Sequence, residues 1–310
     1  MKIVVTPRGF SKCALNNVKI IEEAGHVLEY NDTGKAYTKT EFYKKTIDAD
    51  GIIVGVEIVD REFIDAHPKL KAVVKFGVGT DNIDVDYCKE KGIFVGRTVG
   101  SNSRSVAETA ISFILSDSKN LYESIATTRA HDWTKLTGYE IEGKTIGVVG
   151  FGNIGKHVAK MANGLGMKVI IFDPYFIDAD TLKNYNAQSV TFDEILSKSD
   201  FLSLHMPLTE QTKNLITITE LRKMKPNAVL INTARGGIVN ERDLLFALSE
   251  KIIRCAYFDV LENEPPKHDE PLLKLTNFYL TPHIASRSFE AEKNTADMAT
   301  KIMIEALKRK

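Results

Sequence analysis

The chain has 310 residues, in which 41 Lys and Arg side chains balance 41 Asp and Glu side chains. This length suits about two domains, and the zero net charge gives no support for a nucleic acid partner. There is no apolar run of transmembrane length, and residues 1–7 are typical of an opening strand rather than of a signal peptide. Cys13, Cys88 and Cys255 are isolated and lack metal-ligand spacing, as in a reducing compartment. We therefore expect a cytoplasmic protein with no metal site and no membrane contact.

Short apolar runs alternate with helical patterns along the whole chain. Runs this apolar suit parallel strands that helices cover on both faces. Their alternation with helices predicts right-handed βαβ units and doubly wound sheets, an α/β fold class. The expected strands are residues 3–6, 51–54, 72–76, 93–95, 146–149, 169–172, 201–204, 228–231, 255–260 and 278–280.

Two such sheets fit the chain length. We expect one domain over residues 1–97 and a second over residues 98–285, with the last helical segment, 286–310, returning to pack on the first. One long helical pattern covers residues 103–129, and an exposed-looking arm at 131–133 follows it. This stretch is either an ordinary interdomain helix or a contact between two copies of the chain, because it has apolar surface to cover.

A glycine-rich turn, Gly150-Phe151-Gly152-Asn153-Ile154-Gly155, lies between two apolar runs near the middle of the chain. Gly150 is expected to permit the tight turn, Gly152 to let a pyrophosphate approach the backbone, and Gly155 to let the helix pack close to the strand. The N-terminus of that helix offers free N–H groups to phosphates. Asp173, 18 residues after Gly155, can accept hydrogen bonds from a ribose 2′-hydroxyl, which favours NAD over NADP. The pattern predicts a Rossmann NAD site, against the alternative of a glycine turn without a ligand.

Three further segments lie at expected strand ends, where open α/β sheets bind their ligands. They carry Arg235 before two glycines, Glu264 before two prolines, and His283 after a proline. Taken singly, each has a plainer explanation: a surface salt bridge, a solvated acidic loop, a structural histidine. Together they supply what hydride transfer from an alcohol needs, namely an acid/base, a cation for a carboxylate or carbonyl, and a carboxylate that orients the histidine.

These motifs resemble those of the D-isomer-specific 2-hydroxyacid dehydrogenase family, which includes D-3-phosphoglycerate, glyoxylate/hydroxypyruvate and D-lactate dehydrogenases. The resemblance covers nearly the whole chain: KFGVGTDNID at 75–84, SVAE at 105–108, the glycine turn, and then the Arg, Glu and His segments in family order. It implies flavodoxin-like and Rossmann domains with the active site in the cleft between them. It also implies a homodimer, which here would form through residues 103–133.

The resemblance further implies a role for each matching residue. Arg235 would bind the substrate carboxylate and polarise the carbonyl, His283 would be the general acid or base, and Glu264 would pair with His283. The substrate-binding loop would be Lys75, Phe76, Gly77, Val78 and Gly79, with backbone N–H groups facing the carboxylate. Asp259 would take the nicotinamide carboxamide. The cofactor-binding residues would be Gly150, Gly152, Asn153, Ile154, Gly155, Asp173, His205, Met206, Pro207, Thr233, Ala234, Arg235, Asp259, His283, Ala285 and Ser286.

Departures from the family pattern leave the substrate open between D-3-phosphoglycerate and an unphosphorylated acid such as hydroxypyruvate or glyoxylate. Phosphoglycerate members commonly have an arginine after the strand at 52–54, where this chain has Gly55-Val56-Glu57. The Glu57 carboxylate would repel a phosphate unless Lys75, Arg97 or Arg104 compensates. Formate-oxidising members have glutamine behind the histidine, so Glu264 argues against formate. A non-catalytic NAD-sensing protein on the same fold would keep the same residues and stays an alternative.

Overall fold

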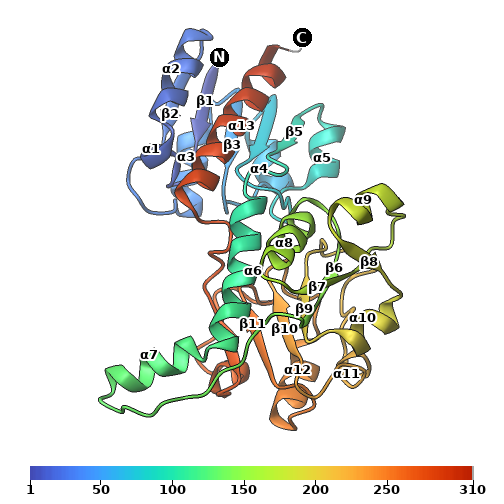
Figure 1. Cartoon of the computed structure of the whole chain (residues 1–310). Helices are drawn as coiled ribbons and strands as arrows, with labels where there is room; N and C mark the ends of the chain where they lie inside the picture. The colour runs from blue at the N-terminus through green and yellow to red at the C-terminus, as the bar shows by residue number, and fades with distance from the viewer. Residues whose placement is uncertain (309–310) are drawn as a thin grey trace. The chain divides into compact units, whose positions relative to one another are not determined.

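The computed structural model describes residues 1–308, apart from the side chains of Cys13 and Leu15. The chain forms two compact units (Figure 1). One consists of Met1–Asn102 and the residues from Ser286 onward, and the other is Ser103–Ala285. The chain thus leaves the first unit after Asn102, whereas the sequence places this boundary after residue 97.

The first unit contains a parallel sheet of order β2-β1-β3-β4-β5. Adjacent residues of one strand point to opposite faces, so Ile53 joins the apolar cluster with Met303 while Ile52 joins the one with Phe63. The strands are β1 (Lys2–Val5), β2 (Val27–Tyr30), β3 (Gly51–Val54), β4 (Ala72–Lys75) and β5 (Phe94–Arg97). The helices are α1 (Phe10–Cys13), α2 (Leu15–Glu23), α3 (Lys39–Thr46), α4 (Arg61–Ala66), α5 (Val85–Glu90) and α13 (Phe289–Lys308).

The last helix, α13, packs on the sheet of the first unit although it is far from that sheet in sequence (Figure 1). Its buried Ala296, Ala299 and Met303 share one apolar cluster with Val5 and Val74. The small alanines let the helix backbone approach the sheet closely. The first unit is therefore closed by a segment that follows the whole of the second unit in the chain.

The second unit contains a seven-stranded parallel sheet of order β12-β11-β10-β9-β6-β7-β8. The order reverses between β6 and β9, which is the switch point where doubly wound sheets bind ligands. The strands are β6 (Thr145–Val149), β7 (Lys168–Phe172), β8 (Ala187–Ser189), β9 (Phe201–Leu204), β10 (Val229–Asn232), β11 (Cys255–Phe258) and β12 (Phe278–Leu280). The helices are α6 (Ser103–Ser118), α7 (Leu121–Arg129), α8 (Asn153–Gly164), α9 (Ala179–Asn184), α10 (Phe192–Lys198), α11 (Ile218–Leu221), α12 (Glu241–Ser249) and the 3₁₀ helix η1 (Pro271–Lys274). The two doubly wound α/β sheets predicted from the sequence are confirmed.

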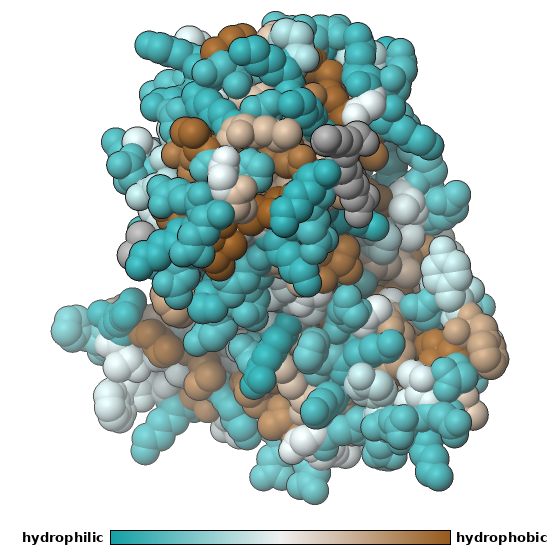
Figure 2. All heavy atoms as spheres, turned by 90° about the horizontal axis from the view of Figure 1, so that it is seen from above, coloured by the Kyte–Doolittle hydropathy of each residue, from teal (hydrophilic) through white to brown (hydrophobic). Residues whose placement is uncertain are grey.

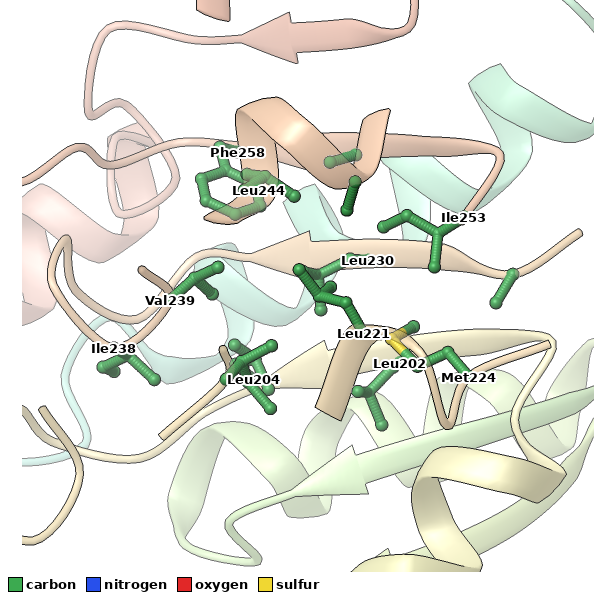
Figure 3. Packing of buried hydrophobic residues seen from close by; sticks show 14 of the residues in the cluster. Leu202, Leu204, Leu221, Met224, Leu230, Ile238, Val239, Leu244, Ile253 and Phe258 are labelled. Carbon is green, nitrogen blue, oxygen red and sulfur yellow. The ribbon is translucent and has the colours of Figure 1, made fainter. Parts of the chain in front are cut away.

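Branched apolar side chains fill the space between this sheet and α12. Figure 3 shows Leu202, Leu230 and Phe258 from neighbouring strands facing Leu244 and Leu221 of the covering segments. All five side chains are at most 1% exposed. Burial of each such side chain contributes about 1.5–3 kcal/mol to the stability of this unit.

The single helix predicted over residues 103–129 is wrong. The chain forms α6, breaks at Asn120 and continues as α7. Asn120 has a φ of 50°, in the left-handed region that asparagine tolerates better than most residues. Its side-chain Nδ2 donates to the carbonyl of Thr137 at 3.1 Å, which fixes the turn. Leu121, the first residue of α7, is 45% exposed.

Hydrophilic side chains cover most of the face seen in Figure 2, with apolar groups scattered between them. Within residues 1–308 no helix is long and apolar enough to span a bilayer. The thiols of Cys88 and Cys255 are free and buried, and burial raises the pKa of Cys88 to about 11. The Cys13 thiol lies outside the described side chains.

Candidate active site

The glycine turn connects β6 to α8, and its three glycines differ in what surrounds them. Gly150 has a φ of 95°, and a Cβ there would lie 2.8 Å from the carbonyl oxygen of His205. A Cβ on Gly155 would overlap the carbonyl oxygen of Gly150, whereas one on Gly152 would meet no atom within 4 Å. The first turn of α8 has no side-chain cap and no acidic residue. The N–H groups at this helix start therefore face open space that suits an anion.

Asp173 follows β7 and lies against the glycine turn. Its Oδ2 accepts a hydrogen bond from the Phe151 N–H at 2.6 Å, and its Oδ1 accepts one from the Tyr175 N–H at 2.9 Å. A carboxylate can accept about four hydrogen bonds, so two positions remain for ribose hydroxyls. Asp173 thus both fixes the turn and keeps acceptor capacity beside it.

Two buried polar atoms without a partner mark the ends of β9 and β10. Leu204 pairs with Asn232 in the ladder, so the residues that follow them, His205 and Thr233, leave the sheet side by side. His205 Nε2 lies 2.8 Å from Ser203 Oγ. Its Nδ1 and the Thr233 Oγ1 are buried, and neither has a hydrogen-bond partner within the described chain.

An unsatisfied buried polar atom costs about 1–3 kcal/mol, so two at one strand edge indicate a polar ligand. The amide, hydroxyl and phosphate groups of a dinucleotide would supply the missing partners, and the residues present fit NAD in this respect. Burial lowers the pKa of His205 to about 3, so its ring is neutral near pH 7. It can then donate at one nitrogen and accept at the other.

Other predicted cofactor residues reach this edge in different ways. Asn153 and Ile154 form the first turn of α8. The Met206 and Ala234 side chains pack in the apolar core, so only their backbone groups are available to a ligand, while Pro207 is exposed.

The turn that carries Arg235 is held by Asn232, a residue that the sequence analysis did not single out. Asn232 Oδ1 accepts from the Ala234 N–H at 3.0 Å, and its Nδ2 donates to the Arg235 carbonyl at 2.9 Å. A Cβ on Gly236 would overlap the backbone of Leu261. This glycine therefore lets the Arg235 turn lie directly on the segment that leads to Glu264. Asn232 is fully buried at the end of β10, a placement that the structure shows and the sequence pattern does not.

His283 and Glu264 form a hydrogen-bonded pair. The distance from His283 Nδ1 to Glu264 Oε2 is 2.6 Å, and the second carboxylate oxygen accepts from the Leu261 N–H at 3.0 Å. Burial raises the pKa of Glu264, but the hydrogen bonds from His283 and Leu261 and the charge of Arg235 outweigh it, so the pKa lies below its usual range. The His283 side chain is 47% exposed, which leaves its Nε2 side accessible to a substrate.

Asp259 organises the backbone around His283. It is 1% exposed, and its carboxylate accepts hydrogen bonds from Thr281 Oγ1 and from the N–H groups of Ile284 and Ala285. His283 itself has a φ of 52°, in the left-handed region. Asp259 and Thr281 thus fix this turn, a task that sequence patterns did not indicate for Thr281. One acceptor position of Asp259 remains for a carboxamide.

The remaining two predicted cofactor residues belong to the same segment. The Ala285 carbonyl accepts from Ser105 Oγ at 2.7 Å, so both polar backbone groups of Ala285 are engaged. Ser286 is half-buried and is the first residue of the chain's return to the first unit.

In the first unit, the loop after β4 presents free backbone donors. The N–H groups of residues 77–79 make no hydrogen bond within the described chain. Gly77 has a φ of 150°, and its carbonyl accepts from the Thr98 N–H at 2.9 Å. Lys75 Nζ donates to the Gly55 carbonyl and to Asn82 Oδ1. Lys75 therefore fixes the neighbouring loop, while the backbone of 77–79 is open to an acceptor.

Residues 111–285 match the model of the D-isomer-specific 2-hydroxyacid dehydrogenase NAD-binding domain. The chain is 37% identical to a glyoxylate reductase of Thermococcus litoralis, over 93% of this chain and 89% of that protein. It is 39% identical to a D-3-phosphoglycerate dehydrogenase of Methanocaldococcus jannaschii, over 89% of this chain but only 52% of that protein.

The chain belongs to the D-isomer-specific 2-hydroxyacid dehydrogenase family. Its fold is also similar to an NAD-dependent formate dehydrogenase of Staphylococcus aureus solved with NAD, with a TM-score of 0.84, 30% identity, and coverage of 99% of this chain and 96% of that one. The resemblance seen in the motifs is thereby confirmed, and so is NAD as the cofactor. The chain is an NAD-dependent oxidoreductase of this family whose substrate is open. Among the described residues, no group of His, Cys, Asp and Glu is arranged to hold a metal ion.

Proposed function

We propose that this protein interconverts a small 2-keto acid and its D-2-hydroxy acid, with Arg235, Glu264 and His283 as the catalytic residues. The observation that carries the proposal is the 2.6 Å hydrogen bond between His283 Nδ1 and Glu264 Oε2. A histidine oriented by a carboxylate and accessible on its other nitrogen has the arrangement that general acid–base catalysis requires. The named substrates of the relatives, glyoxylate and D-3-phosphoglycerate, belong to this chemical class.

In the reducing direction, protonated His283 gives its Nε2 proton to the carbonyl oxygen of the keto acid. Glu264 stabilises the positive charge of the imidazole before transfer and keeps Nδ1 as the donor to the carboxylate. Arg235 binds the substrate carboxylate and polarises the carbonyl through its forked donors. NAD, when bound, carries the hydride. In the oxidising direction neutral His283 takes the hydroxyl proton.

We propose further contacts for the substrate and the cofactor. The free N–H groups of residues 77–79 would bind the substrate carboxylate. The glycine turn and the start of α8 would hold the pyrophosphate, and Asp173 the adenosine ribose. His205 and Thr233 would bind the polar groups of the cofactor that lie along β9 and β10.

The test is NADH oxidation by the purified protein with pyruvate, hydroxypyruvate, glyoxylate and phosphohydroxypyruvate. We expect turnover with at least one of them, and a loss of about 10³-fold or more in His283→Gln with NADH affinity nearly unchanged. Unchanged turnover in His283→Gln would remove this residue from the proposed role. Tight NADH binding without turnover on any acid would instead favour a non-catalytic NAD-sensing protein.

We also propose a cytoplasmic homodimer formed through residues 103–133. The segment between α6 and Tyr139 leaves its unit as an arm, in which α7 projects from the end of α6 (Figure 1). The Tyr139 N–H donates to the Ser118 carbonyl at 2.8 Å, which closes the base of the arm. The arm exposes Leu121, Tyr122, Ile125, Trp133 and Leu136 by 40% to 78%, more apolar surface than a free arm would keep. Light scattering should give twice the chain mass, and Ile125→Asp with Trp133→Ser should give monomers; a wild-type monomer would contradict the proposal.

A further inference from the structure

The loop after β3 exposes two apolar side chains at the carboxyl edge of the first sheet. Val56 is 76% exposed and Ile58 is 64% exposed. Val54 pairs with Lys75 in the ladder, so this loop runs beside the loop of residues 77–79, whose N–H groups are free. Neighbouring strands are about 4.8 Å apart. A ligand acceptor held by residues 77–79 would therefore have its next substituent within reach of the loop after β3.

The charges around Val56 are turned inward. Glu57 is 8% exposed, and its Oε2 accepts from the Gly55 N–H at 2.9 Å. Lys75 Nζ donates to the Gly55 carbonyl at 2.5 Å. The sequence predicts that Glu57 repels a phosphate unless Lys75, Arg97 or Arg104 compensates for its charge. Both the Glu57 carboxylate and the Lys75 ammonium instead hydrogen-bond the backbone of Gly55, and Val56 is left as the exposed side chain of this loop.

Asn82 fixes the loop in this conformation. Its side-chain Nδ2 donates to the backbone carbonyls of Glu57 and Gly55. The backbone carbonyl of Asn82 accepts from the Val59 N–H at 2.8 Å. Asn82 Oδ1 also accepts from Lys75. The loop is thus tied at both ends to the segment that follows β4, so the position of Val56 is set by the fold.

We propose that Val56 is a specificity-determining residue that faces the substituent next to the substrate carbonyl and selects a short, uncharged group. This inference rests on the proposed function, because it places the substrate carboxylate at residues 77–79. A phosphate against an apolar side chain would lose hydration without gaining a partner, which is costly. A methyl, hydroxymethyl or hydrogen substituent loses little hydration at the same place. The preferred substrates are therefore unphosphorylated 2-keto acids.

Two arginines at the same edge of the sheet would support the opposite specificity, a preference for a phosphorylated acid. Arg8 follows β1, which neighbours β3, and Arg97 ends β5, where it pairs with Lys75 in the ladder. Both are exposed. They are the cations that a substrate phosphate would use if Val56 does not decide specificity, so neutral variants of both belong in the test.

The experiment compares kcat/KM for pyruvate, hydroxypyruvate, glyoxylate and phosphohydroxypyruvate with NADH. We expect the wild type to prefer an unphosphorylated acid at least tenfold. Val56→Arg should raise the ratio of kcat/KM for phosphohydroxypyruvate to kcat/KM for pyruvate at least tenfold, because it adds a forked phosphate donor at that point. Ile58→Arg is the matched control: it adds the same charge two residues away and should change the ratio less than threefold. Arg8→Gln and Arg97→Gln should leave the wild-type preference unchanged.

Three results would overturn the inference while the proposed function stands. The first is a wild-type preference for phosphohydroxypyruvate that Arg8→Gln or Arg97→Gln abolishes. The second is an unchanged ratio in Val56→Arg with pyruvate turnover intact. The third is a change of this ratio in Ile58→Arg that is as large as the change in Val56→Arg. A lack of turnover on every acid by the wild type is different, since it contradicts the proposed function itself.

Discussion

His283 and Glu264 are joined by a hydrogen bond of 2.6 Å between Nδ1 and Oε2, although 18 residues lie between them in the chain. The contact depends on two backbone arrangements. His283 is held in a left-handed turn by Asp259, and the Glu264 carboxylate is fixed by the Leu261 N–H. The pair is therefore set before any substrate binds, and its charge state can be tested directly.

In wild type, kcat for keto-acid reduction is expected to fall on the alkaline side of its pH profile. Glu264→Gln should move this fall to lower pH by about one pH unit. The pKa of Glu264 is held below its usual range, so this group is a carboxylate through the neutral region and favours the protonated imidazole. Reduction needs that protonated form, and glutamine removes the charge that favours it. The measurement is kcat against pH with NADH. Glu264→Asp is the control, because it keeps the charge and should keep the wild-type profile more closely. Superimposable profiles for wild type and Glu264→Gln would contradict this prediction.

The glycine turn allows a matched pair of substitutions. Gly155→Ala should destabilise the second unit by about 2 kcal/mol or more, because its Cβ would overlap the carbonyl oxygen of Gly150. Gly152→Ala should cost less than about 1 kcal/mol, since no atom lies within 4 Å of the new Cβ. Yet it should weaken NADH binding at least tenfold if a pyrophosphate occupies that space. Urea unfolding and NADH fluorescence titration measure the two effects, and a Gly152→Ala variant with wild-type NADH affinity would place the pyrophosphate elsewhere.

Sequence patterns predicted the buried strands well but missed two of the four edge strands, finding β5 and β12 and not β2 and β8. The interior strands β3, β9 and β10 are buried along their whole length, so they read as apolar runs. The edge strands β2 and β8 were missed because one face of each is open to solvent; Val27, at the start of β2, is 68% exposed. Mixed burial removes the apolar run on which the prediction depends.

In the candidate site, sequence patterns indicate the functional residues but not the residues that hold them in place. Motif residues such as Arg235 and His283 are visible in the sequence because they lie beside glycine or proline. The residues that hold them, Asn232 and Thr281, act through hydrogen bonds to backbone groups of the turns. Nothing in their sequence spacing distinguishes them from ordinary polar residues. Likewise, the inward turn of the Glu57 carboxylate depends on the Gly55 N–H, a contact that no pattern of residue types reveals.

Asp173→Asn should shift cofactor preference toward NADP by at least tenfold in the ratio of kcat/KM values. The substitution removes the charge that would repel a 2′-phosphate, and its remaining oxygen can still accept from a backbone N–H of Phe151 or Tyr175. Asp173→Ala removes both of these acceptors, so it should also weaken NAD and NADP binding together by loosening the glycine turn. Steady-state kinetics with NADH and NADPH separate the two effects. An unchanged ratio in both variants would exclude Asp173 as the ribose acceptor.

His205 should make stability depend on pH in a way that His205→Gln removes. Burial lowers the pKa of His205 to about 3, while an unfolded histidine titrates near ~6.5. Between these values the unfolded chain binds a proton that the folded protein does not. Stability is therefore lost as pH falls below about 6.5, by about 1.4 kcal/mol per pH unit from this residue. From pH 6.5 to 5 the wild type should lose about 2 kcal/mol more than His205→Gln.

The measurement is urea unfolding of both proteins at pH 6.5 and pH 5, where all other titrating groups are shared and cancel in the difference. His131→Gln is the control, because His131 is exposed on the arm and the substitution there replaces a histidine without changing a buried site. This control should lose as much stability as the wild type. Equal losses in wild type and His205→Gln would mean that His205 is protonated in the folded protein at pH 5. Its Nδ1 would then be a donor at that pH, and the ring could no longer accept a hydrogen bond from the cofactor as the neutral histidine can.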